Sequence, residues 1–145
     1  MRILALDYGS KRIGIALSDE LGLTARSLAT IKRKSRVQDM EKISRIVGEY
    51  GIEKVVIGYP LRLDGTEGIQ CEKVSKYAEI LSSHLSIPVI KWDESLSTKE
   101  AETILIEADI KPRKRREVVD KVAASIILQG YLNNLNRKKT KDVTR

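Results

Sequence analysis

The sequence predicts one α/β domain whose mixed sheet of five strands carries helices on both faces. Three short apolar segments separated by glycine-containing loops come first, which is the pattern of an antiparallel meander. Two further apolar runs each follow a segment of helical periodicity, which is the pattern of parallel strands joined by right-handed crossovers. A chain of 145 residues that is 41% hydrophobic is long and apolar enough for one such domain.

The meander is expected to consist of strands at residues 2–6, 13–18 and about 25–31, with Gly9 and Gly22 in the loops. The first strand contains the unbroken apolar run Ile3–Leu6 and ends at Asp7. A charge at the lip of a buried strand is unfavourable unless it is solvated, paired or bound to a cation, so Asp7 indicates a site. The alternative is that Asp7 only accepts hydrogen bonds from turn N–H groups, as aspartate often does before glycine.

The first helix is expected over residues 37–50, and its ends are marked by capping signals. Ser35 and Gln38 are placed as a capping box, and Gly51 is placed as the C-terminal stop. Five apolar residues recur at helical spacing along this segment, namely Val37, Met40, Ile43, Val47 and Tyr50.

A parallel strand, a second helix and another strand follow. The β-branched run Val55–Ile57 within residues 54–58 is typical of a buried parallel strand, and the loop Gly58–Pro60 ends it. The second helix is expected from about 67 to 85 because apolar residues recur along one face. The fifth strand is expected over residues 87–92.

Two helices complete the domain. A short helix is expected over about 97–108, after a capping box, and the last helix is expected from about 117 to 135. The basic segment from 137 to 145 has no hydrophobic pattern and is expected to be disordered, so the domain should span residues 1–136. The core stripe of the last helix is expected to be Val119, Val122, Ile126 and Ile127.

This order of elements, β-β-β-α-β-α-β-α-α, is the order of a ribonuclease H-like domain. In that arrangement the first strand is central, and the fourth and fifth strands run parallel to it. Their carboxyl ends therefore open on one edge of the sheet. Ligand binding and chemistry are expected at that edge.

Three elements bring carboxylates to this edge. The first strand ends at Asp7, the fifth ends at Asp93 and Glu94, and the last helix carries Asp120. Two alanines, three and four residues after Asp120, are small enough to let that helix approach the sheet closely. Taken singly, Glu94 could cap the next helix and Asp120 could pair with Arg116.

Taken together, the three acids favour a metal site. Converging carboxylates repel one another, and divalent cations between them remove that repulsion. Oxygen-only ligation suits Mg²⁺ or Mn²⁺. Two such ions about 4 Å apart can activate a water, steady the attacked phosphate and stabilise the leaving oxygen. We therefore predict a catalytic and metal site formed by Asp7, Glu94 and Asp120.

The positive charge of the chain predicts an anionic partner. The formal net charge is +7 and the sequence pI is about 9.5, with clusters at 32–36, 111–116 and 137–145. Such clusters follow the phosphate backbone of nucleic acid, although basic loops also keep small proteins soluble. One Trp and no Phe argue against a base-stacking platform. The residues expected to contact phosphate are Lys11 and Arg12 beside Asp7, and Arg113, Lys114, Arg115 and Arg116 in a loop before the last helix.

Cysteine usage and apolar runs bear on the compartment. Cys71 has no second Cys or His at metal-ligand spacing and allows no internal disulfide, which fits a reducing cytoplasm. No apolar run approaches membrane-spanning length, so a soluble cytoplasmic protein without a membrane partner is expected. A monomer and a dimer are both compatible with the sequence.

Four motifs occur in the order of a known family. They are Asp7-x-Gly9-x-Lys11-Arg12-Ile13-Gly14-Ile15-Ala16, then Gly58-x-Pro60-Leu61-x-x-Asp64-Gly65-Thr66-Glu67-Gly68, then Asp93-Glu94-x-Leu96-Ser97-Thr98, and finally Lys121-x-Ala123-Ala124-x-x-Ile127-Leu128. From Met1 to about Leu135 the chain resembles the YqgF-type pre-16S rRNA nucleases, also described as RuvC-like Holliday junction resolvase homologues.

The resemblance implies a cytoplasmic, metal-dependent endonuclease of the ribonuclease H superfamily that trims the 5′ end of the 16S rRNA precursor. It carries the family's acids onto Asp7, Glu94 and Asp120. The family usually has Arg after the Asp-Glu pair and Asn in the Gly-x-Pro loop, where this chain has Ser95 and Arg62. An Arg beside Glu94 could clamp a phosphate and Ser95 cannot, so Arg62 is expected to supply that charge instead.

Three alternatives are compatible with these residues. A Holliday junction resolvase-like DNA endonuclease would cleave branched DNA with the same acids. A catalytically silent module would bind nucleic acid through its basic clusters alone. The Asp-x-Gly start also resembles the first phosphate loop of actin-like ATPases, but those enzymes bind nucleotide between two such domains and 145 residues provide one.

Overall fold

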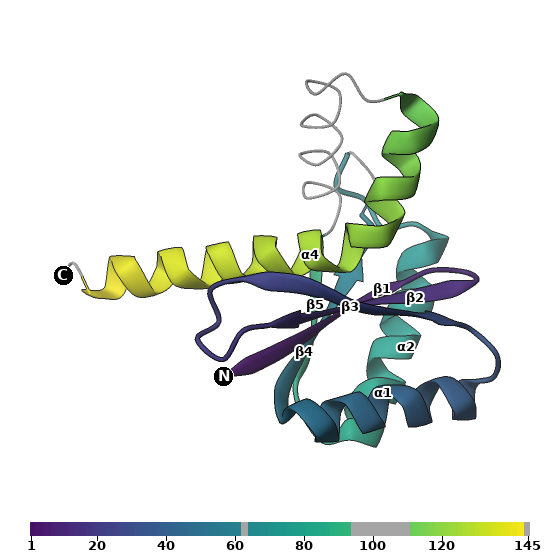
Figure 1. The fold of residues 1–145 in the computed structure, drawn as a ribbon, viewed down its shortest axis with the longest axis horizontal. Coiled ribbons are helices and arrows are strands. Elements are labelled where there is room, and N and C mark those ends of the chain that lie inside the picture. Colours follow the sequence, from purple (N-terminus) through teal and green to yellow (C-terminus); the bar gives the residue numbers. More distant parts are fainter. Residues whose placement is uncertain (62–63, 94–110, 144–145) are drawn as a thin grey trace.

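The computed structural model describes residues 1–61, 64–93 and 111–143 (Figure 1). The elements follow in the order β1 (Arg2–Tyr8), β2 (Arg12–Ser18), β3 (Ala25–Lys32), α1 (Arg36–Tyr50), β4 (Ile52–Tyr59), α2 (Ile69–Leu85), β5 (Val89–Asp93) and α4 (Pro112–Val143). The short helix expected over about 97–108 lies outside the described residues. Within the described ranges, no helix combines the length and the apolar character needed to cross a membrane.

The strands form one sheet in the order β3-β2-β1-β4-β5, which confirms the expected fold class. β1 pairs antiparallel with β2, and β2 pairs antiparallel with β3, so the first three strands are a meander. β4 runs parallel to β1, and β5 runs parallel to β4. β1 is therefore the central strand, and the carboxyl ends of β1, β4 and β5 lie at the same edge of the sheet.

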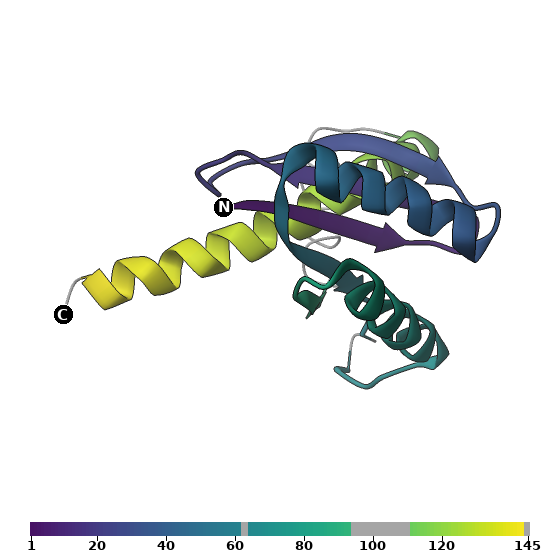
Figure 2. The same ribbon diagram turned by 90° about the horizontal axis from the view of Figure 1, so that it is seen from below.

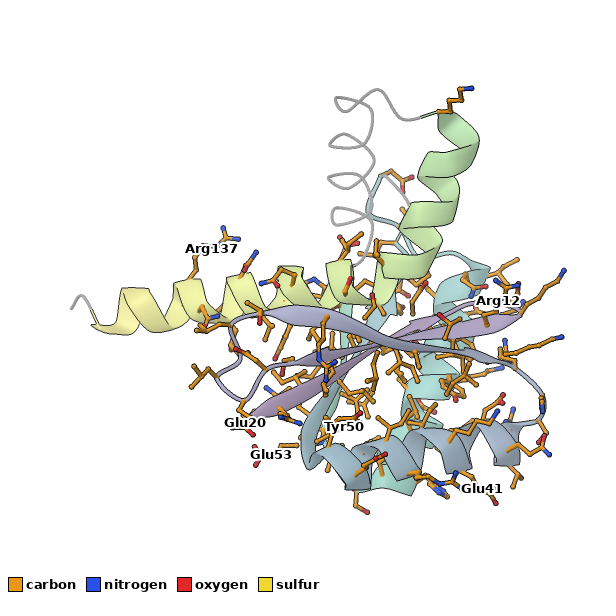
Figure 3. The ribbon with its side chains drawn as sticks, viewed as in Figure 1. Arg12, Glu20, Glu41, Tyr50, Glu53 and Arg137 are labelled. Atoms are coloured by element: carbon orange, nitrogen blue, oxygen red, sulfur yellow. The ribbon has the colours of Figure 1, made fainter. Side chains whose placement is uncertain are left out.

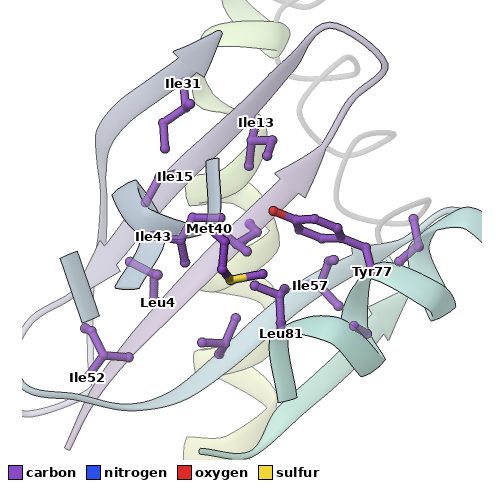
Figure 4. Packing of buried hydrophobic residues seen from close by; sticks show 14 of the residues in the cluster. Leu4, Ile13, Ile15, Ile31, Met40, Ile43, Ile52, Ile57, Tyr77 and Leu81 are labelled. Atoms are coloured by element: carbon purple, nitrogen blue, oxygen red, sulfur yellow. The ribbon is translucent and has the colours of Figure 1, made fainter. Parts of the chain in front are cut away.

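β1 is buried on both faces because its side chains alternate between two hydrophobic clusters. Leu4 and Leu6 pack on the face covered by α1 and α2. Ile3 and Ala5 pack on the face covered by α4. Figure 4 shows side chains of both helices against the first face, among them Met40, Ile43, Tyr77 and Leu81. Figures 1 and 2 show these helices and α4 on opposite sides of the sheet.

The ends of α1 confirm the capping signals in the sequence. The Ser35 hydroxyl accepts a hydrogen bond from the Gln38 N–H at 3.1 Å, and Gly51 ends the helix with a φ of 62°. The sequence did not predict a second bond at this end. The buried carboxylate of Asp39 accepts the Lys34 N–H at 3.1 Å. Both bonds hold the chain where it leaves β3 and enters α1.

α4 is longer than expected at both ends. It begins at Pro112 instead of about 117, and it continues to Val143 instead of ending near 135. Proline suits the first position of a helix, and Lys and Arg are good helix formers. No glycine or proline follows Gly130 to stop the helix. Residues 112–116, expected in a loop, and residues 137–143, expected to be disordered, are therefore helical.

The buried stripe of α4 also differs from the expected one. Ile127 is buried as expected, but Val122 and Ile126 are only half-buried. The side chain of Val119 lies outside the described residues. The buried positions recur at helical spacing as Ala124, Ile127, Leu128, Tyr131 and Leu132. The predicted stripe left out the small Ala124 and the aromatic Tyr131, and without them the leucines at 128 and 132 do not stand out as part of the same helical face.

The later part of α4 docks on the β2–β3 hairpin through two side-chain amides. Gln129 Oε1 accepts the Ala25 N–H at 2.9 Å, and Gln129 Nε2 donates to the Leu23 carbonyl at 3.0 Å. Asn136 Nδ2 donates to the Gly22 carbonyl at 3.1 Å. These bonds join residues at least 104 positions apart in the chain and hold α4 along the sheet.

Replacing Gly51 by alanine should destabilise the protein by about 1 kcal/mol, because the φ of 62° is unfavourable for an L side chain. The matched control is Gly48→Ala in the same helix, where a Cβ would meet nothing within 4 Å. Alanine is favoured over glycine inside a helix by about 0.5–1 kcal/mol. Urea unfolding should therefore show a lower free energy of unfolding for the first variant and a higher one for the second. Equal losses would contradict the assigned helix end.

Candidate active site

Asp7 lies within β1, which extends beyond its expected end at Leu6 to Tyr8. It pairs with Gly14 of β2 and is half-buried. Because side chains alternate along a strand, Asp7 shares the α4 face of the sheet with Ile3 and Ala5. This residue therefore stands at the edge where the carboxyl ends of the parallel strands meet.

α4 passes closely over the sheet beside Asp7. A Cβ at Gly14 would lie 3.5 Å from the Cβ of Asp7 and 3.6 Å from the Cβ of Ala124. Gly14 and Ala124 are thus the small residues at this crossing. Asp120 belongs to α4 and precedes Ala124 by four residues, so the two positions share one side of the helix. The side chain of Asp120 lies outside the described residues.

The end of β5 is the second acidic position. β5 runs to Asp93, which is half-buried and aligned with the last residue of β4. Trp92 packs toward α4, where its ring centroid is 5.4 Å from that of Tyr131, so alternation assigns Asp93 to the opposite face. Glu94 lies outside the described residues, as does Arg62 in the loop after β4.

The β1–β2 turn joins Asp7 to two exposed cations, Lys11 and Arg12, of which Figure 3 labels Arg12. The Gly9 N–H donates to the Arg12 carbonyl at 2.9 Å. A Cβ on Gly9 would lie 2.7 Å from that oxygen, which is closer than real side chains come, so glycine allows the turn to close this tightly. Lys11 and Arg12 therefore lie on the same turn as Asp7, where we expected them.

Arg33 holds this turn in place, a role that the sequence pattern did not predict. Its Nη1 donates to the carbonyls of Gly9 at 2.9 Å and Ser10 at 3.2 Å. Its Nη2 donates to the Tyr8 hydroxyl at 2.7 Å, and the guanidinium lies 4.5 Å from the centroid of the Tyr8 ring. The signal that could have found this role is the register of β3 on β2, which brings residue 33 beside the turn.

A stack of two tyrosines connects the turn to α2. The ring centroids of Tyr8 and Tyr77 are 4.2 Å apart, with 18° between the ring planes. The Tyr77 hydroxyl is buried and has no hydrogen-bond partner among the described residues. Burial raises the pKa of Tyr77 to about 12, with smaller contributions from Tyr8 and Asp39. Arg33 and the tyrosine stack together tie the turn to β3 and α2.

The loop after β4 is shaped by its own hydrogen bonds. The Asp64 carboxylate accepts the Thr66 hydroxyl at 2.6 Å and the Thr66 N–H at 2.9 Å, and these bonds lower the pKa of Asp64. Gly65 between them has a φ of 83°. The buried Cys71 thiol donates to the Pro60 carbonyl at 3.4 Å, so the single cysteine packs against the loop.

The basic cluster Arg113–Arg116, which includes Lys114 and Arg115, lies in the first turns of α4 and not in a loop. Its side chains lie outside the described residues. Figure 1 shows this first part of α4 standing away from the sheet, on the side opposite α1. The backbone therefore puts the cluster on a different side of the sheet from the connection between β3 and α1.

A family model and two named relatives each match this chain over most of its length. The RuvX family, described as Holliday junction resolvase, matches residues 1–134. A protein of Syntrophus aciditrophicus named "Putative pre-16S rRNA nuclease" is 62% identical over 139 residues, which are 96% of this chain and 93% of the relative. A protein of Halothermothrix orenii with the same name is 50% identical over 137 residues, which are 94% of this chain and 98% of the relative.

The fold is also similar to that of a solved nucleic-acid complex. The structure of T. thermophilus RuvC with a Holliday junction substrate aligns with a TM-score of 0.54 and 12% sequence identity. The alignment covers 88% of this chain and 91% of that chain. At this level of identity the likeness concerns the fold.

Gly9→Ala should destabilise the protein by roughly 1–3 kcal/mol, because the new Cβ would meet the backbone oxygen of Arg12 and the turn would have to open. Gly14→Ala is the matched control, since its Cβ would make only ordinary contacts at 3.5 and 3.6 Å. The control should change the free energy of unfolding by about 0.5 kcal/mol or less. Urea unfolding of both variants checks the order, and a larger loss for Gly14→Ala would show that the turn tolerates a side chain.

Tyr77→Phe should leave the stability near pH 7 unchanged or slightly raised, because the hydroxyl that it removes is buried without a partner among the described residues. At high pH the two proteins should differ. The pKa of Tyr77 rises from 10.0 to about 12 on folding, because the folded state favours the neutral hydroxyl. The stability that depends on this neutral form is fully present below pH 10 and is lost as the pH rises toward 12. Unfolding free energies across that interval should fall less in Tyr77→Phe than in wild type, and identical declines would contradict the raised pKa.

Proposed function

This chain belongs to the RuvX family, and we propose that it is a nuclease that hydrolyses phosphodiester bonds at the 5′ end of precursor 16S rRNA. The observation that carries the proposal is similarity over nearly the whole chain to relatives that are named for this substrate. The net charge of +7 suits a polyanionic substrate. A protein that processes precursor rRNA works in the cytoplasm.

Asp7 and Asp120 are assigned to the catalytic and metal-binding site. Carboxylate oxygens are the ligands that Mg²⁺ and Mn²⁺ prefer, which fits the residues at this edge. Gly14 and Ala124 are small enough to let α4 cross the sheet closely beside Asp7, and this supports a site shared by β1 and α4. Asp120, one helical turn before Ala124, supports the approach of a second carboxylate from α4.

Strand alternation favours Glu94 over Asp93 as the third acid. Ile90 and Trp92 pack toward α4, on the same face as Asp7. Asp93, the last residue of β5, belongs to the series on the opposite face. Glu94 is therefore the acid that we assign to the site together with Asp7 and Asp120.

The bound divalent cation would supply the positive charge that activates water and stabilises the attacked phosphate. The part played by the protein is to keep three mutually repelling carboxylates ionised at one edge and to hold the substrate there. Lys11 and Arg12 are exposed on the turn beside Asp7, where they can position a phosphate. Further phosphate contacts are assigned to Arg62, Arg113, Lys114, Arg115 and Arg116.

Branched DNA is the second candidate substrate. The family description refers to Holliday junction resolvase, and the T. thermophilus RuvC of similar fold is bound to a Holliday junction substrate. The same acids would cleave DNA by the same chemistry. We favour precursor rRNA because the similar full-length relatives carry that name.

Asp7→Asn should lower Mn²⁺-dependent cleavage by at least about 100-fold, because the amide keeps the shape of the side chain and loses the charge that attracts a cation. The assay compares a precursor 16S rRNA fragment, a four-way DNA junction and plain single strands, each with and without Mn²⁺. Wild type should cleave the rRNA fragment fastest. Preferential cleavage of the junction would instead support the second candidate.

Two controls accompany this test. Mn²⁺ should raise the Tm of wild type by mass action and raise that of Asp7→Asn less, so that metal binding is measured apart from turnover. Glu94→Gln should reduce cleavage far more than Asp93→Asn, because Asp93 belongs to the face of β5 opposite Asp7. Cleavage by Asp7→Asn near the wild-type rate would overturn the assigned site.

A further inference from the structure

We propose that the β1–β2 turn and the connection from β3 to α1 form one basic surface that binds the phosphate backbone of a nucleic-acid strand leading to Asp7. We call this surface the basic rim, and it consists of Lys11, Arg12, Lys32, Lys34 and Arg36. The inference rests on the proposed function, because the rim would hold the substrate of that nuclease. It joins Lys32, Lys34 and Arg36, which come from the basic cluster at 32–36, to Lys11 and Arg12 in one surface.

The fold brings the two segments of the basic rim together although they are far apart in the sequence. Arg12 is paired with Lys32 in the ladder between β2 and β3. The Arg33 N–H donates to the Lys11 carbonyl at 2.9 Å, which continues the pairing past the end of the strands. The turn that carries Lys11 and Arg12 therefore lies beside the connection that begins at Lys32.

The charges of the basic rim are directed to solvent. Each of its five residues is exposed, and within the described part of the chain none of them takes part in an ion pair. The acid closest in sequence, Asp39, is buried and accepts the Lys34 N–H at 3.1 Å. A row of exposed cations without paired acids is the electrostatic pattern that follows a phosphate backbone.

The backbone of the basic rim is held in advance of binding. Arg33 is not one of its phosphate contacts, because its guanidinium already bonds the carbonyls of Gly9 and Ser10 and the Tyr8 hydroxyl. Ser35 and Asp39 fix the start of α1 on the other side. A surface whose backbone is ordered before binding loses less conformational entropy when the strand is bound.

The position of the basic rim complements the cluster Arg113–Arg116. The rim lies at the turn next to Asp7 and at the start of α1, and α1 covers the sheet face opposite α4 (Figure 1). The cluster lies in the first turns of α4. A strand that passes Asp7 can therefore meet cations from two separate segments of the chain, the rim and the start of α4.

The test is a triple variant, Lys32→Gln, Lys34→Gln and Arg36→Gln, which leaves Lys11, Arg12 and Arg33 intact. The probe is a labelled single-stranded fragment of precursor 16S rRNA, bound in EDTA so that no cleavage occurs. Loss of three phosphate contacts should make the slope of log affinity against log salt less steep by about 2, at ~0.7 per contact for a single strand. Affinity at low salt should fall by about tenfold or more.

The matched control removes the same number of charges elsewhere, with Arg26→Gln, Arg137→Gln and Lys138→Gln. These three residues are exposed, Arg26 lies at the far end of β3 from Lys32, and Figure 3 shows Arg12 and Arg137 at opposite ends of the molecule. The control should keep the wild-type slope. Equal effects of the two triple variants would overturn the proposal, because net charge alone would then explain them.

A second readout separates this inference from the proposed function. With Mn²⁺ present, the rim variant should raise the KM for the rRNA fragment and leave kcat near wild type, since the acids are untouched. Wild-type cleavage with an unchanged slope and KM in the rim variant would overturn the basic rim alone. A rim-dependent slope in a protein that cleaves nothing would support the rim and overturn the nuclease.

Discussion

The structure depends on one strand, β1, which is buried on both faces and still carries a carboxylate near its end. Leu4 and Leu6 pack beneath α1 and α2, while Ile3 and Ala5 pack beneath α4. The same alternation carries Asp7 to the α4 face, so the place of the acid is a continuation of the hydrophobic pattern. A shift of one residue in β1 would turn Asp7 away from α4 and exchange the two hydrophobic sets at the same time. Packing and chemistry are therefore set by a single register.

Chemistry and substrate binding are supported by different segments of the chain. Asp7 belongs to β1 and Asp120 belongs to α4, and the small residues Gly14 and Ala124 let the two elements cross closely. The basic rim belongs to the turn and to the start of α1, where Arg33, Tyr8 and Tyr77 hold the backbone. This separation lets cations collect beside the site without standing between the carboxylates, where they would compete with a metal ion.

Local signals in the sequence predicted the elements whose ends are determined locally, and missed features that depend on tertiary contacts. Ser35 and Gly51 mark the ends of α1 by their own hydrogen bonding and φ, and the structure confirms both. The predicted ends of α4 were wrong because no helix-breaking residue follows Gly130 and because Pro112 can begin a helix. The positions of Asp7, Lys11 and Arg12 at one turn could be predicted because these residues directly follow a recognisable strand. Arg33 was missed because its role exists only once β3 pairs with β2.

The docking of α4 on the β2–β3 hairpin has an evolutionary consequence. Gln129 and Asn136 bond main-chain atoms of Leu23, Ala25 and Gly22, and no side chain of the hairpin takes part in these bonds. Exposed positions at its tip such as Leu21 and Leu23 can therefore change their side chains without releasing the helix. The two amides have no such freedom, because each must keep its length and its hydrogen-bonding group. Selection should consequently conserve Gln129 and Asn136 and leave exposed tip positions such as Leu21 and Leu23 free to drift.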